Sequence, residues 1–220
     1  MSEDKKNNKS VSEEKIKGFL NSHSGIIKTS DFEYAGIPRH YLADMLSENS
    51  IVCESHGYYY TSGSEPNIYE KLQARSKKIV FSYGTALYMN GLIDTAPRII
   101  DVTVPQGTNV SRIKERYGKY VKFHYCIQSR YYVGTSSFYC GPFEGLRVYG
   151  KERCICDIVK KPETIEKDMF DEALRRYFGS EYYEERLHSL ADILGVRDKI
   201  EHIEEIYKPN EKMEKNDKTR

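Results

Sequence analysis

The hydrophobic positions near the start of the chain follow a helical spacing. Ser10 and Glu13 have the spacing of a capping box, and apolar residues then share one helical face over residues 16–20. This pattern predicts a first helix that begins near Ser10 and ends near Ser22, where a Ser-Gly pair interrupts the apolar face.

Two further helices and a hairpin are predicted before residue 65. Ser30 and Glu33 repeat the capping-box spacing, which predicts a short helix over Ser30–Ala35. Gly36 ends this helix as a left-handed C-cap residue does. The next helix, Pro38–Glu48, begins on a proline, which suits a first helical turn. Two β-prone runs at 50–54 and 58–60 flank a glycine-containing turn. The order of helix, short helix, glycine turn, helix and hairpin predicts a winged helix-turn-helix over residues 1–65, with Pro38–Glu48 as its recognition helix.

Strand and helix signals alternate in the rest of the chain after a turn-rich joint at residues 62–67. The predicted strands lie at 79–81, 98–104 and 121–125, with less regular candidates at 131–139 and 143–149. The predicted helices lie at 68–75, 83–92, 151–161, 165–178, 187–194 and 200–206. Residues 208–220 are polar and without a period, which predicts a disordered tail. We therefore expect an α+β protein, with the winged helix followed by a mixed α/β domain over 66–207 that ends in a helical segment.

The near-neutral net charge of +1 conceals a basic middle segment. Residues 66–161 contain 16 lysines and arginines against 7 aspartates and glutamates, a net charge of +9. The flanking segments 1–65 and 162–220 carry net charges of −3 and −5. A basic stretch of this kind attracts polyanions because binding releases their counterions.

Two groups of residues are candidates for contact with double-stranded DNA. The N-terminal part of a recognition helix faces base edges, so Arg39 is expected to read a guanine and His40 to donate to a base or a phosphate. Asp44 on the same helix and His56 in the hairpin turn complete the first group. The second group lies in the basic segment and is expected to contact phosphates: Arg112, Lys114, Arg116, Lys119 and Lys122. A solvated charged helix and strand edge is the alternative for this second group.

The sequence lacks the common signatures of enzymes and cofactor sites. It has no Walker loop, no G-x-G-x-x-G, no H-E-x-x-H and no G-x-S-x-G, so we expect no enzymatic activity and no cofactor. Five cysteines occur without a C-x-x-C pair, which favours reduced thiols in the cytoplasm over a metal site. Arg153 and Asp157 have the i,i+4 spacing of a modest structural ion pair. Neither an apolar run long enough to span a membrane nor a secretory signal is present, so no membrane partner is expected.

Three segments in collinear order resemble the AbiEi-type antitoxins of type IV toxin–antitoxin systems. The first runs from Ile27 through Ala35-Gly36-Ile37 to Gly57-Tyr58-Tyr59; the second comprises residues 81–92 and 102–107; the third comprises 148–158 and 170–177. The resemblance as a whole covers residues 25–206. The turn of the predicted hairpin carries Glu54-Ser55-His56, where similar proteins often carry Arg or Lys, and the tyrosine-rich stretch 117–146 matches poorly.

The resemblance implies a repressor that binds inverted repeats in its own promoter and neutralises a nucleotidyltransferase-like toxin. In type IV systems the antitoxin counters the toxin's effect without forming a stable complex with it, so the resemblance implies the same here. Two alternatives stay open. The chain could be a stand-alone winged-helix transcription factor with no toxin partner, or a metal-dependent nuclease, although Asp101 on its strand is not followed by an E-x-K pattern.

Overall fold

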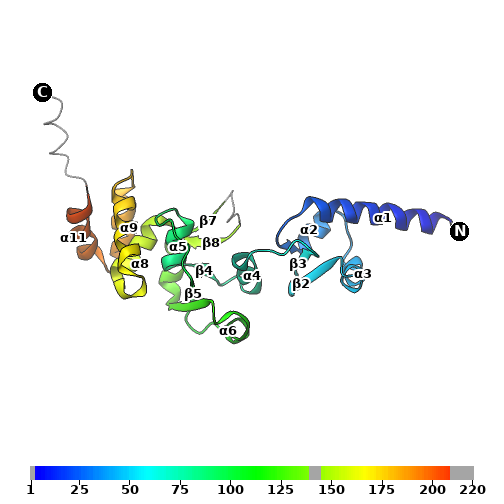
Figure 1. Cartoon of the computed structure of the whole chain (residues 1–220), viewed down its shortest axis with the longest axis horizontal. Helices are drawn as coiled ribbons and strands as arrows, with labels where there is room; N and C mark the ends of the chain where they lie inside the picture. The colour runs from blue at the N-terminus through cyan, green and yellow to red at the C-terminus, as the bar shows by residue number, and fades with distance from the viewer. Residues whose placement is uncertain (1–2, 139–144, 209–220) are drawn as a thin grey trace, which may run out of the picture. The chain divides into compact units, whose positions relative to one another are not determined.

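A computed structural model describes residues 3–138 and 145–208 of the chain (Figure 1). Within those ranges the protein has eleven α-helices and two β-sheets, which confirms the expected α+β class. The chain forms two compact units, Met1–Lys77 and Lys78–Arg220.

The division between the units lies after the helix α4 (Ile68–Arg75), not at the turn-rich joint at 62–67. The helix belongs to the first unit because it packs on the strand β2. Arg75 Nε donates a hydrogen bond to Glu54 Oε1 at 2.7 Å, and Ser55 Oγ donates to the carbonyl of Ala74 at 2.9 Å. The boundary is thus set by side-chain contacts that local turn signals do not report.

The first unit combines four helices with a small antiparallel sheet. Its remaining helices are α1 (Glu3–Ser22), α2 (Thr29–Tyr34) and α3 (Tyr41–Ser47). Its strands are β1 (Ile27–Lys28), β2 (Ile51–Ser55) and β3 (Tyr58–Thr61), in the order β1-β3-β2. One hydrophobic cluster unites them, formed by Ile16, Leu20, Ile27, Phe32, Ile37, Leu42, Met45 and Ile51.

Each predicted element of this unit is present, with shifted ends. The first helix begins at Glu3 rather than Ser10; the segment before Ser10 holds no glycine or proline that would end a helix. The helix expected over Pro38–Glu48 begins at Tyr41, although its first turn is prepared by hydrogen bonds from the amides of Tyr41 and Leu42 to the carbonyls three residues earlier. The two-residue strand β1 was not predicted, since two residues are too few to show an alternation.

The second unit is built on a mixed five-stranded sheet of order β6-β5-β4-β8-β7. Two neighbouring pairs, β5–β6 and β4–β8, are parallel, and β4–β5 and β7–β8 are antiparallel. The strands are β4 (Val80–Phe81), β5 (Ile100–Pro105), β6 (Val121–Cys126), β7 (Thr135–Ser137) and β8 (Arg147–Tyr149). The strand β5 is buried along its whole length, so it forms the centre of this unit's core.

Helices cover this sheet and continue into the expected C-terminal helical segment. They are α5 (Tyr83–Met89), α6 (Ser111–Tyr117), α7 (Gln128–Tyr131), α8 (Lys151–Lys160), the 3₁₀ turn η1 (Pro162–Thr164), α9 (Lys167–Phe178), α10 (Glu184–Leu194) and α11 (Arg197–Tyr207). The helix α8 contacts α5, α9, α10 and α11 and is buried from Glu152 to Val159. It is therefore the central helix of this unit.

The tyrosine-rich stretch departs most from the expected strands. Where a strand was predicted over 131–139, Tyr131 ends the helix α7 and only Thr135–Ser137 pair as a strand. Tyr131 is buried, and its hydroxyl donates to the carbonyl of Lys78 at 2.7 Å. This long-range bond fixes the ring in a helix where local propensity favours a strand. Residues 139–144, part of both strand candidates, and 209–220, nearly all of the expected tail, lie outside the described ranges.

Among the described residues, no helix has both the length and the apolar character needed to cross a bilayer.

Candidate functional site

The predicted base-reading residues lie just before α3 (Arg39 and His40) and on it (Asp44), exposed to solvent. Leu42 and Met45 face the core, whereas Arg39, His40 and Asp44 are exposed. The Arg39 side chain is 70% exposed, and its Nε donates to Glu33 Oε1 of α2 at 2.5 Å. Such an exposed ion pair stabilises little and is readily exchanged for another acceptor. Arg39, His40 and Asp44 are therefore all accessible to solvent.

The hairpin turn presents His56 but hides the acidic residue beside it. His56 is exposed in the turn between β2 and β3, and Gly57 adopts a φ of 79° there. The Gly57 carbonyl accepts from the amide of Thr29 at 3.0 Å, which ties the turn to the start of α2. Glu54 is buried and paired with Arg75. Its negative charge is thus neutralised inside the unit and is not displayed at the turn.

The five basic residues predicted to contact phosphates lie at two places in the second unit. Arg112, Lys114 and Arg116 lie on α6, and Lys119 is exposed in the loop after it. The Nζ atom of Lys114 lies over two rings of β6, at 5.6 Å from the centre of Phe123 and 5.8 Å from that of Tyr125. We call this surface, formed by α6, Lys119 and the two rings of β6, the α6–β6 surface.

Lys122 does not belong to the α6–β6 surface. Side chains alternate along a strand, so Lys122 lies on the face of β6 opposite to Phe123. It lines a hollow together with Asp101, Arg98 and Glu163. The expectation that all five basic residues form one group is therefore wrong for Lys122, which the alternation of β6 separates from the other four.

A histidine–aspartate pair that the sequence did not single out joins β5 to β6. His124 Nε2 lies 2.7 Å from Asp101 Oδ1, and both side chains are almost fully shielded. The ring of Tyr83 stacks on that of His124 with centres 4.1 Å apart. Burial raises the pKa of Tyr83 well above its ordinary value, so its hydroxyl stays protonated. The three side chains form a rigid polar group on the sheet.

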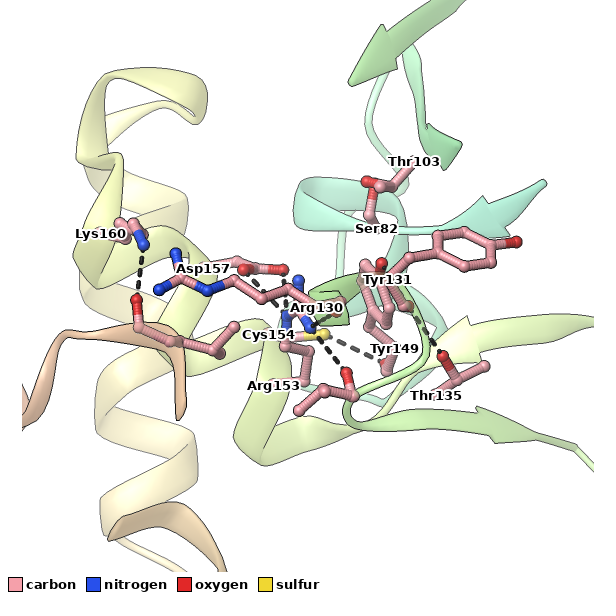
Figure 2. A network of polar contacts seen from close by, with 12 residues as sticks. Ser82, Thr103, Arg130, Tyr131, Thr135, Tyr149, Arg153, Cys154, Asp157 and Lys160 are labelled. Atoms are coloured by element: carbon pink, nitrogen blue, oxygen red, sulfur yellow. Dashed lines mark hydrogen bonds and ion pairs between the residues drawn. The ribbon is translucent and has the colours of Figure 1, made fainter. Parts of the chain in front are cut away.

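A second buried polar group surrounds Arg153 of α8 (Figure 2). Its Nε donates to both carboxylate oxygens of Asp157, at 3.0 and 2.9 Å, and its Nη1 donates to the carbonyls of Arg130 and Val133 at 2.8 and 2.6 Å. The guanidinium also lies 4.2 Å from the centre of the Tyr149 ring. The predicted i,i+4 pair is present, but it is buried and clamps the loop after α7 to α8, which a surface pair could not do.

The two polar groups border a pocket of about 420 Å³ in the second unit. The pocket opens beyond the carboxyl ends of the parallel strands β5 and β6, where Gln106 and Ile127 follow them. Its cationic lining comprises Arg130, Arg153, Lys160 and Lys161, and Asp157 is the one acidic residue among the described residues that line it. Of these residues, the sequence had drawn attention only to the Arg153–Asp157 pair.

Sequence reasoning missed most of this pocket because its residues come from separate elements. His124 lies within an alternating strand, where a lone histidine carries no motif. Lys160 and Lys161 end α8, and basic residues at a helix C-terminus are ordinary. The available signal was weak: the three cations Arg130, Lys160 and Lys161 all belong to the basic middle segment.

One group of metal-type ligands exists among the described residues, formed by Glu184, His188 and Glu204. Internal partners already occupy it. Glu184 Oε2 accepts from Lys208 Nζ at 2.9 Å, and Glu204 pairs with His188 at 2.7 Å. Tyr182 donates to the other oxygen of Glu204 at 3.1 Å. This arrangement is that of an ion-pair cluster which joins α10 to α11.

Comparisons with known proteins place few limits on the chain. No family model matches it, and no curated protein matches it significantly. Among solved structures, it is similar to the crystal structure of the RV2827C protein from Mycobacterium tuberculosis, at 15% identity and a TM-score of 0.48. That match covers 89% of this chain and 80% of the other.

Proposed function

We propose that the protein is a DNA-binding transcriptional repressor of its own promoter and an antitoxin of the AbiEi type. The observation that carries the DNA-binding part is the element order of the first unit. The first unit begins α1-β1-α2-α3-β2-β3, which is a helix, a short strand, two helices and a two-stranded hairpin. This is the order of a winged helix-turn-helix. On this proposal α3 is the recognition helix and β2–β3 the wing.

The exposed start of α3 supports its assignment as the DNA reader. Arg39 and His40 lie directly before its first turn, next to the part of a recognition helix that reaches base edges in the major groove. Arg39 is held only by an exposed pair with Glu33, so a guanine can replace that partner. Asp44 lies one turn further and suits a cytosine amino group.

The buried pair of Glu54 and Arg75 favours DNA binding by the wing. The sequence places an acidic residue at the hairpin, where it would repel phosphates. Because Arg75 neutralises Glu54 inside the unit, the exposed residue of the turn is His56. Affinity then depends on charge from elsewhere, and the α6–β6 surface of the second unit offers exposed lysines and arginines for phosphate contacts.

The antitoxin part rests on the resemblance described above. Its third segment corresponds to α8 and α9, the buried centre of the second unit, so the resemblance concerns residues that build the fold. We propose a nucleotidyltransferase-like toxin as the partner, neutralised in the cytoplasm without a stable complex.

Binding to the chain's own promoter tests the first part. Arg39→Ala should weaken specific binding by about 1–3 kcal/mol, because alanine cannot make the bidentate hydrogen bonds to guanine. Arg197→Ala on α11 removes the same charge and serves as the matched control. In a gel-shift titration, equal affinities of the Arg39 variant and the wild type would remove Arg39 from the recognition surface.

Co-expression with the neighbouring gene tests the second part. The full chain should restore growth to cells that express a toxin encoded beside it, and the two proteins should elute separately in size-exclusion chromatography. Growth arrest that the chain does not relieve would leave the stand-alone repressor as the function.

A further inference from the structure

The pocket beyond β5 and β6 has a charge that the proposed DNA-binding and antitoxin functions do not require. Arg130, Arg153, Lys160 and Lys161 line it, and both carboxylate oxygens of Asp157 already accept hydrogen bonds from Arg153. No carboxylate among the described residues pairs with the side chains of Arg130 or Lys161. The pocket therefore holds uncompensated positive charge.

The cations crowd one another, which is unfavourable unless an anion joins them. The pKa of Lys160 is lowered by burial and by the nearby charge of Arg130. Figure 2 shows the Arg130 side chain extending from α7 toward Lys160, whose Nζ donates to the carbonyl of Leu194 at 2.6 Å. Like charges held together at the mouth of a pocket are typical of sites for phosphate groups.

The position in the fold is one where ligands bind. In sheets with parallel strands, ligands lie beyond the carboxyl ends of the strands. Gln106 and Ile127 continue from the parallel strands β5 and β6 at that edge. The volume of about 420 Å³ suits a small ligand.

The rim adds an aromatic surface to the basic interior. Phe123 and Tyr125 of β6 line the pocket, and Tyr125 is 46% exposed although its ring is large. Ile127 beside it is also exposed. Any type of nucleobase can stack on a ring of this kind, because every base has an aromatic face. The Tyr125 ring lies on the face of the edge strand β6 opposite to His124, beside Lys114, so a base reaches this ring around the edge of β6 while its phosphates meet the cations of the pocket.

The walls of the pocket are fixed in advance. The Arg153–Asp157 pair, in which Arg153 Nε donates to both carboxylate oxygens, closes one side, and His124, held by Asp101 and stacked on Tyr83, closes another. A site whose walls are already ordered loses little entropy when a ligand enters.

We propose that this pocket binds a nucleoside phosphate, with the phosphates at Arg130, Lys160 and Lys161 and the base against Tyr125. The nucleotide is either free or the 5′-phosphorylated end of a single strand, since both present the same groups. This site is separate from the α3 surface and shares Tyr125 with the α6–β6 surface, but the inference does not rest on the proposed function.

Calorimetric titration of the full chain tests the site with ATP, GTP, CTP, UTP, inorganic triphosphate and a dinucleotide with or without a 5′-phosphate. At least one nucleotide should bind, and Arg130→Gln and Lys161→Gln should each weaken it by about tenfold, because each removes a charge-assisted hydrogen bond. Both side chains reach the surface, so both variants should fold. Arg112→Gln on α6 lies outside the pocket and is the matched control.

The ring is tested separately with Tyr125→Ala. This variant should weaken nucleotide binding by about tenfold and leave inorganic triphosphate unchanged, because only the base stacks. Tighter binding of the 5′-phosphorylated dinucleotide than of free nucleotides would identify a strand end as the ligand. No binding of any probe at millimolar concentration, or binding that Arg130→Gln and Lys161→Gln leave unchanged, would overturn the proposal. Equal loss of triphosphate and nucleotide in Tyr125→Ala would overturn the assignment of the base.

Discussion

Arg153 and Asp157 show at the residue scale how burial changes the meaning of a sequence pattern. On a solvent-exposed helix their i,i+4 pair would contribute a few tenths of a kcal/mol. Here the side chains are 4% and 9% exposed, and the guanidinium also donates to the carbonyl of Arg130 in α7 and to that of Val133 in the loop after it. Burial raises the pKa of Asp157, so this carboxylate depends on Arg153 for its charge.

Removing one member of this pair should cost much more than removing a surface pair. We expect Arg153→Ala to lower the free energy of unfolding by about 3–5 kcal/mol, since Asp157 is left buried without a partner. Urea denaturation measures the change. Arg39→Ala, which breaks an exposed ion pair of 2.5 Å with Glu33, should cost about 1 kcal/mol or less.

The double variant Arg153→Met/Asp157→Leu separates the charge from the packing. It should recover a large part of the stability that Arg153→Ala removes, because no unpaired charge remains in the core. Equal destabilisation of the single and double variants would show that packing of the arginine, and not its charge, stabilises α8.

The cysteines should differ in reactivity according to their burial. Burial raises the pKa of Cys156 to about 12 and that of Cys154 above its ordinary value as well, whereas Cys53 is exposed. The reacting species is the thiolate, whose fraction falls as the pKa rises above the pH. At pH 8 we expect iodoacetamide to label Cys53 and to spare Cys154 and Cys156, as measured by peptide mass spectrometry. After denaturation all three should react; labelling of Cys154 in the native protein at the rate of Cys53 would contradict this burial.

At the scale of elements, the existence of α4 was predictable from the sequence, but the unit to which it belongs was not. The sequence predicted residues 68–75 as a linking helix, and Asn67 caps it by accepting from the amide of Glu70 at 2.9 Å. Capping is local, so it is visible in the sequence. The contacts of α4 with β2 join residues about twenty positions apart and have no local signal.

The fragment Met1–Lys77 should therefore be more stable than Met1–Glu65. The shorter fragment lacks Arg75 and leaves Glu54 without its partner, and it also lacks the buried Leu72. We expect a cooperative urea transition for the longer fragment and a transition at lower urea, or none, for the shorter one. Arg75→Gln in the longer fragment separates the ion pair from the helix. Identical transitions for the two fragments would place the boundary at the predicted joint.

At the scale of the whole molecule, the distribution of charge matters more than its sum. The segment 66–161 carries +9 within a chain of +1, and much of that charge lies on α6 and around the pocket. On the proposed function, residues 1–65 with their net charge of −3 need added positive charge to hold a duplex.

Neutralising Lys114, Arg116 and Lys119 together should lower the salt dependence of promoter affinity. Removing one phosphate-binding cation reduces the slope of log K against log salt by about 0.9, so the slope of the triple glutamine variant should fall by about 2.7. The variant Lys167→Gln/Arg197→Gln/Lys199→Gln makes the same charge change in the C-terminal helices. An unchanged slope, together with failure to rescue cells from the toxin, would assign the α6–β6 surface to the antitoxin function.

The sequence by itself determined the α+β class, most of the helices and the presence of a basic middle segment. Capping boxes, apolar periods and turn residues act between neighbours in the chain, and so does the charge of a segment. Only the tertiary structure decided that Glu54 is buried and that Lys122 lies apart from the other four predicted basic residues. It also decided that Arg130, Lys160 and Lys161 line one pocket. These residues come from different elements, and their contacts arise only when the sheet orders its strands as β6-β5-β4-β8-β7 and α8 packs on α5 and the C-terminal helices.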